Sequence, residues 1–231
     1  MRQIIMDTET TGLDPKSGDK IIEIGAVELI ERKLTHKNYH QYIQPERDVP
    51  EDAIAVHGIT NEFLEDKPIF SDVVDDFMEF VAGAELIIHN APFDVGFINH
   101  ELSLLKNNRW GKIEDHCTIT DSLKMARKSF PGQRNTLDAL CKRFGIDNSN
   151  RTLHGALLDS EILADVYLAM TGGQTALSLH EEYEGNASGN VIQLDVNRPK
   201  LKVLKATDDE LMRHQQKLEA ISKKFGETIS W

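Results

Sequence analysis

The sequence predicts an α/β protein with a mixed five-stranded sheet flanked by helices. Three strand-like segments follow one another at the start of the chain, and two further apolar strands then alternate with helical patterns. Strands joined by short turns run antiparallel, whereas strands separated by a helix run parallel, so the sheet should be mixed. The expected strands are residues 4–11, 21–30, 36–43, 85–89 and 116–120.

Helices are predicted where apolar residues recur every three or four positions, as they do in residues 70–81. Pro92 fits a first helical turn, where its missing N–H would have no partner, and Gly83 and Gly145 are typical of helix ends. The expected helices are residues 51–56, 70–81, about 91–105, a short one after Asp121 or Ser122, 137–144, 155–170 and 208–224.

Composition limits the classes of function. The chain has 231 residues, 40% of them hydrophobic, which allows one substantial domain and an appendage. Its formal net charge of −12 argues against a broad basic surface for nucleic acid, so handling phosphates would require metal ions. Cys117 and Cys141 have no spacing that suggests a disulfide framework or a zinc site. Without a leader pattern or an apolar run of about 18 residues, we expect a cytoplasmic protein with no membrane partner.

Beyond Gly173 the composition changes. Residues 181–190 are acidic with Gly, Asn and Ser, which is typical of a linker. Residues 191–231 contain one predicted helix and too few apolar residues to bury a core alone. We therefore expect one domain over residues 1–173, followed by a flexible C-terminal extension that needs a partner.

Two acidic residues interrupt the first strand. Asp7 and Glu9 follow the apolar residues 4–6, and alternate strand positions point to the same face, about 6 to 7 Å apart. Like charges that close disfavour each other's ionised form unless a cation lies between them, and oxygen ligands suit a divalent ion. The alternative is a solvated turn with two surface acids, because Asp-x-Glu also occurs by chance.

Three further residues are candidates on weaker grounds. Asp94 follows a buried strand, where open α/β sheets bind ligands, although an acid also suits a first helical turn. Asp159 lies beside the apolar stripe of the helix at 155–170, where an acid is usually solvated. His154 precedes Asp159 by five positions, which places it on the loop before that helix rather than in a zinc-binding helix. Near acids, a histidine is a candidate general base; an exposed loop histidine is the alternative.

In order along the chain, these motifs resemble a known family. Asp7-Thr8-Glu9, Asn90-x-x-Phe93-Asp94 and His154-x-x-x-x-Asp159 are similar to the three motifs of the histidine-bearing DEDD (DEDDh) 3′ to 5′ exonucleases, whose fold is ribonuclease-H-like. His57-Gly58-Ile59-Thr60 and residues 152–159 extend the resemblance to the proofreading subunits of bacterial replicative DNA polymerases.

This resemblance implies roles for the candidate residues. The cofactors would be two divalent ions, Mg²⁺ or Mn²⁺. Their ligands would be Asp7, Glu9, Asp94 and Asp159. His154 would be the catalytic base that takes a proton from the attacking water. The residues expected to bind the substrate are Asp7, Glu9, Asp52, His57 and Asp159.

The resemblance is strong over residues 2–173 and also implies partners. Residues 174–180 are similar to a sliding-clamp-binding peptide, with contacts expected from Gln174, Leu177 and Leu179. Residues 191–231 would bind the catalytic (alpha) subunit of the polymerase, and a small accessory subunit would be a further partner. The substrate would be a single-stranded or frayed DNA 3′ end, from which nucleoside 5′-monophosphates are released.

Two other functions stay open on sequence alone. An RNA-trimming exonuclease of the same family would share every catalytic residue but should lack the clamp-like peptide and the polymerase-binding tail. A non-catalytic adaptor between polymerase and clamp would have no need for the four acids and the histidine, all of which are present.

Overall fold

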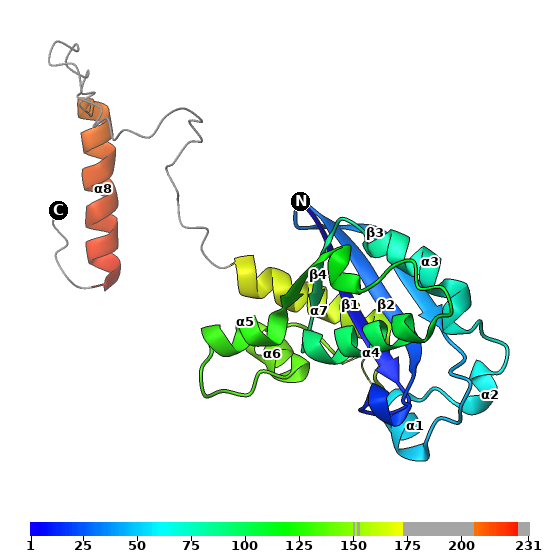
Figure 1. Ribbon diagram of the computed structural model, residues 1–231. Helices are drawn as coiled ribbons and strands as arrows, with labels where there is room; N and C mark the ends of the chain where they lie inside the picture. Colours follow the sequence, from blue (N-terminus) through cyan, green and yellow to red (C-terminus); the bar gives the residue numbers. More distant parts are fainter. Residues whose placement is uncertain (150, 152, 173–205, 226–231) are drawn as a thin grey trace, which may run out of the picture. The chain divides into compact units, whose positions relative to one another are not determined.

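The computed structural model describes residues 1–149, 151, 153–172 and 206–225 (Figure 1). The chain divides into two compact units, residues 1–179 and 180–231. The predicted linker and the clamp contacts Gln174, Leu177 and Leu179 lie outside the described residues, as does much of the predicted polymerase-binding tail. None of the helices in the described part of the chain is both long and apolar enough to span a membrane.

The sheet of the first unit has the strand order β3-β2-β1-β4-β5. Its antiparallel half is β1 (Arg2–Thr10), β2 (Ile21–Ile30) and β3 (Lys33–Tyr42). Its parallel half adds β4 (Glu85–Ile88) beside β1 and β5 (Thr118–Asp121) beside β4. The predicted mixed five-stranded sheet is therefore confirmed.

Helices cover both faces of this sheet (Figure 1). They are α1 (Glu51–His57), α2 (Asn61–Leu64), α3 (Phe70–Val81), α4 (Ala91–Leu104), α5 (Ser122–Ser129), α6 (Leu137–Phe144) and α7 (Ala156–Gly172). The predicted helices match these bounds to within a few residues. Only α2 was not predicted, because a helix of four residues is too short to show a periodic pattern.

Side chains of β1 alternate between two cores. Ile4 and Met6 pack with residues of α3 and α4, whereas Ile5 packs with residues of α7. Asp7 and Glu9 continue the row of Ile5 and therefore lie on the α7 side of the sheet. This alternation decides which helix supplies their neighbours.

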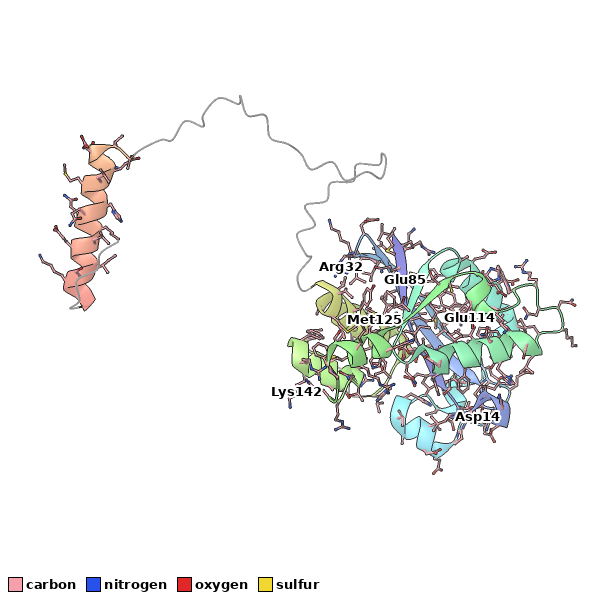
Figure 2. The ribbon with its side chains drawn as sticks, turned by 60° about the vertical axis from the view of Figure 1, so that its left-hand side comes forward. Asp14, Arg32, Glu85, Glu114, Met125 and Lys142 are labelled. Atoms are coloured by element: carbon pink, nitrogen blue, oxygen red, sulfur yellow. The ribbon has the colours of Figure 1, made fainter. Side chains whose placement is uncertain are left out.

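The hairpin between β2 and β3 differs from the expected one. Strand β3 begins at Lys33 rather than at residue 36, because Glu31 and Arg32 alone form the turn, both with positive φ. The positive φ of His36 and a register shift between β2 and β3 mark a bulge in β3 that the sequence pattern hides. Arg32, labelled in Figure 2, donates from this turn to the carbonyl of Leu168 and holds the end of α7.

In the second unit, the described residues form helix α8 (Asp208–Phe225). Thr207 caps it, since the Glu210 carboxylate accepts from Thr207 N at 2.8 Å and the Thr207 hydroxyl accepts from Glu210 N. Leu211 and Met212 are 54% and 58% exposed, and Figure 2 shows side chains projecting from several sides of the helix. The predicted helix and its cap are confirmed.

Candidate active site

The candidate site lies where β1 extends beyond its parallel neighbour. Pairing of β1 with β4 ends at Met6, because β4 stops at Ile88. Beyond that point a cleft of about 760 Å³ opens at the carboxyl ends of the two strands, the usual ligand position in open α/β sheets. The residues predicted to act as metal ligands or base all line this cleft: Asp7, Glu9, Asp94, His154 and Asp159.

Helix α7 reaches this cleft because β2 carries a glycine beneath it. A Cβ atom on Gly25 would lie 2.1 Å from the backbone of α7, so a larger residue would push the helix away. The Ser160 hydroxyl donates to the Gly25 carbonyl at 2.8 Å, and Ala156 N donates to the buried Glu23 carboxylate at 3.1 Å. These contacts fix the first turns of α7, which carry Asp159.

Asp94 enters the cleft from α4. The helix is preceded by Asn90 in a left-handed conformation with φ of 74°, which asparagine tolerates better than most residues. The Asp94 side chain lies in the first turn, is only 2% exposed and accepts a hydrogen bond from the Thr8 hydroxyl at 2.6 Å. This bond ties the start of α4 to β1.

Burial and mutual repulsion raise the pKa values of these carboxyl groups. Burial is the largest cause, and it raises the pKa of Asp7 well above its usual range, that of Glu9 to about 8 and that of Asp94 to about 7. Charges on Asp94, Glu9 and Asp159 add to the increase at Asp7. The charges of these neighbouring carboxylates therefore disfavour the ionised form of Asp7.

This donor set fits a divalent cation. Ligand atoms of Glu9, His154 and Asp159 lie within 4.8 Å of one another. Carboxylate oxygens are the ligands that hard divalent ions prefer, and a positive ion would remove the repulsion that raises the pKa of Asp7. The residues present can thus hold a metal ion without further protein groups.

Arg151 is a site residue that sequence reasoning missed. Its side chain is 8% exposed and donates to both carboxylate oxygens of Asp159, with Nη2 2.7 Å from Oδ2. Nη1 lies 2.8 Å from Asp138, and Nη2 lies 2.9 Å from Nδ1 of His154. The hydrogen bonds to Asp159 raise the pKa of Arg151 further. Its position three residues before His154 was the available signal.

Two residues of α1, Asp52 and His57, were expected to bind the nucleotide, but neither lines the cleft. His57 is 6% exposed; its Nδ1 accepts from Ile59 N at 3.0 Å, and its Nε2 has no hydrogen-bond partner within the described residues. Burial lowers the pKa of His57. His154 N donates to the carbonyl of Val56, so α1 ends beside the loop that carries the predicted base. Asp52 is exposed in the first turn of α1.

Polar and basic residues form the other wall of the cleft. Sequence reasoning gave these residues no role in the site, because they gather only through folding. They are His89, Arg127, Gln133, Arg134 and Asn135.

Comparison with known proteins identifies the family. The sequence profile of the family described as Exonuclease matches residues 4–167. The chain belongs to this exonuclease family. DNA polymerase III subunit epsilon of Escherichia coli (strain K12) is 53% identical to this exonuclease over 235 residues, with 99% of this chain and 96% of that protein covered. The predicted resemblance to proofreading subunits is confirmed.

Solved structures show the same fold as the exonuclease. Exonuclease X in complex with 5′ overhanging duplex DNA is 26% identical, with a TM-score of 0.57 over 74% of this chain and 91% of that one. The nuclease domain of 3′hExo, a DEDDh family member bound to rAMP, is 22% identical, with a TM-score of 0.58 over 73% and 90%. The predicted ribonuclease-H-like fold is confirmed.

Proposed function

We propose that this exonuclease is the proofreading (epsilon) subunit of a bacterial replicative DNA polymerase and removes nucleotides from the 3′ end of DNA. The observation that carries the proposal is the convergence of four carboxyl groups and one imidazole on a single cleft, from segments far apart in the sequence. The 53% identity to DNA polymerase III subunit epsilon over 99% of the chain supports the substrate and the assembly.

In the proposed reaction, water attacks the phosphorus of the last phosphodiester. The bond to the 3′ oxygen of the penultimate nucleotide breaks, and a nucleoside 5′-monophosphate is released. His154, whose side chain is 46% exposed beside the cleft, takes the proton of the water, and solvent returns a proton to the 3′ oxygen.

The proposed cofactors are two Mg²⁺ or Mn²⁺ ions. When bound, such ions supply positive charge that activates the water and stabilises the leaving oxygen. Asp7 interacts electrostatically with the other three acids, which supports a position for it among the residues that would hold the ions. The proposed ligands are Asp7, Glu9, Asp94 and Asp159.

We further propose that His57 contacts the terminal nucleotide. Its buried Nε2 atom has no partner within the described residues, so a substrate group could satisfy it. The carbonyl of the preceding residue, Val56, accepts from His154 N, so His57 belongs to the segment that contacts the loop of the proposed base. Asp52, exposed on the same helix, and the ligands Asp7, Glu9 and Asp159 complete the proposed substrate contacts.

The proposed partners bind beyond the exonuclease domain. Residues 191–231 would bind the catalytic subunit of the polymerase, and Gln174, Leu177 and Leu179 would contact the sliding clamp. Truncation after Gly173 should leave hydrolysis intact and abolish co-purification with the catalytic subunit. Continued association of the truncated chain would contradict this assignment of the tail.

The test of the activity compares the full chain with Asp7→Asn on 3′-labelled single-stranded DNA and on RNA of the same sequence, with Mg²⁺. The wild type should release deoxynucleoside monophosphates, and the variant should be slower by about 10³-fold or more, because one proposed metal ligand is lost. Faster release from RNA than from DNA would favour the RNA-trimming enzyme. No hydrolysis of either substrate by the wild type would favour the adaptor.

A further inference from the structure

The guanidinium of Arg151 contacts the same atoms that a divalent ion would use. Its Nη2 atom lies 2.7 Å from Oδ2 of Asp159 and 2.9 Å from Nδ1 of His154. These two residues belong, with Glu9, to the group whose ligand atoms converge within 4.8 Å. A cation from the chain itself therefore already lies between two of the three converging side chains.

The same contact engages the proposed base. A guanidinium has N–H donors and no acceptor, so the bond between Arg151 and His154 requires Nδ1 to accept. The lone pair on that nitrogen is then not free to take a proton from water. One side chain thus holds both a proposed metal ligand and the proposed base.

Arg151 also has a second acid to pair with. Its Nη1 atom lies 2.8 Å from Asp138 of α6, whose side chain is 62% exposed and lies at the edge of the same cleft. A guanidinium that leaves Asp159 would therefore keep a carboxylate partner. The charge of Arg151 need not become buried and unpaired when its main bond breaks.

We propose that Arg151 is an internal counter-ion that competes with a divalent cation for Asp159 and, until the cation binds, holds Asp159 and His154 together. Binding of the cation transfers Asp159 to the ion and shifts Arg151 towards Asp138, which frees Nδ1 of His154. The inference rests on the proposed function, because it requires Asp159 to be a metal ligand.

Competition of this kind has two opposite consequences. Removing the guanidinium should strengthen cation binding, because the ion no longer displaces a charge-assisted pair and no longer faces a like charge. It should also destabilise the protein in EDTA, because Asp159 loses its hydrogen bonds. A residue that merely supported the fold would lower the stability without raising the affinity for the ion.

The test is calorimetric titration of the full chain with Mn²⁺ alone, without nucleic acid, for the wild type and Arg151→Gln. We expect Arg151→Gln to bind Mn²⁺ about 10-fold more tightly and to unfold at a lower temperature in EDTA. Equal or weaker binding by Arg151→Gln would overturn the proposal. If that variant does not fold, Arg151→Lys serves instead. We expect it to bind Mn²⁺ about 3-fold more tightly than the wild type, because an ammonium group keeps the positive charge but cannot donate to both oxygens of Asp159 as the guanidinium does.

The matched control is Arg2→Gln. Arg2 donates to the buried Glu28 carboxylate at 2.6 Å, so its loss removes the same charge and a similar ion pair outside the cleft. We expect it to lower the unfolding temperature and leave the Mn²⁺ affinity unchanged; an equal gain in affinity would overturn the proposal. If neither the wild type nor Arg151→Gln binds Mn²⁺, the proposed metal site is wrong, and the proposed competition between Arg151 and the cation is wrong as well. If both bind equally, only the competition fails.

Discussion

The strand and the helix that face each other in the cleft carry their acids in different ways. Asp7 and Glu9 project from the middle of a sheet, where burial and neighbouring acids raise their pKa values. Asp159 of α7 is also buried, but Arg151 donates to both of its oxygens. Backbone pairing holds the strand acids in place despite their repulsion, whereas a salt bridge holds the helix acid. The strand acids should therefore destabilise the protein without a cation, and the helix acid should not.

The largest expected effect concerns the loop before the helix. His154→Gln should lower turnover on single-stranded DNA by about 10² to 10⁴-fold, because the water loses its proposed base. The strand acids are untouched, so Mn²⁺ should still bind. Turnover measured across pH 6 to 9 checks this prediction, and an unchanged rate and pH profile would remove His154 from the mechanism.

The next effect sharpens the contrast directly. Asp159→Asn should lower the free energy of unfolding in EDTA by about 2 to 3 kcal/mol, because Arg151 loses its charge-assisted hydrogen bonds to Asp159 and keeps only Asp138 as an acidic partner. Denaturation by urea measures this loss. Unchanged or increased stability would show that the salt bridge contributes nothing to the fold.

A third effect tests how the helix is placed against the strand. Gly25→Ala should cost about 2 to 3 kcal/mol of stability, since the new Cβ would lie 2.1 Å from the α7 backbone. Movement of α7 should also weaken Mn²⁺ binding, because Asp159 moves with it. Gly96→Ala, where a Cβ would meet nothing within 4 Å, is the matched control. It should leave Mn²⁺ binding unchanged and raise stability by about 0.5 to 1 kcal/mol, because alanine favours the interior of α4.

The smallest effect is a pH dependence due to the strand. The pKa of Glu9 is raised to about 8, so the folded protein binds more protons than the unfolded chain between about pH 4.5 and 8, and stability falls as pH rises through this window. His57 and His89 have lowered pKa values and act oppositely below about pH 6.5. Between about pH 6.5 and 8 the raised pKa values of Asp7 and Asp94 act in the same direction as that of Glu9, so Glu9→Gln is needed to isolate its share.

Over that interval, Glu9 should account for about 1 to 2 kcal/mol of the fall in stability in EDTA, and the slope should be shallower by that amount in Glu9→Gln. Urea denaturation at several pH values measures both slopes. Equal slopes in the wild type and the variant would contradict the assignment of the effect to Glu9.

Much of the fold was predictable because its signals are local. Apolar runs, helical periodicity and turn residues predicted the strands and helices of the exonuclease domain. The position of Asp7 and Glu9 directly after an apolar run marked them as candidate site residues. Asp94 and Asp159 were weak candidates by pattern, and only their order in a family motif joined them to the strand. Arg151 and Glu23 were missed because their importance depends on which segments meet: one pairs with Asp159, and the other accepts from the first turn of α7.

The most direct test of the central claim is the unfolding temperature of Asp7→Asn and the wild type, each in EDTA and in Mn²⁺. In EDTA the variant should unfold at the higher temperature, because it removes an acid whose ionised form is disfavoured by desolvation and by the neighbouring carboxylates. In Mn²⁺ the order should reverse, because only the wild type keeps the full set of ligands and gains stability from binding. A variant that unfolds below the wild type in EDTA, or a wild type that Mn²⁺ does not stabilise, would contradict the claim that these acids form a divalent-cation site.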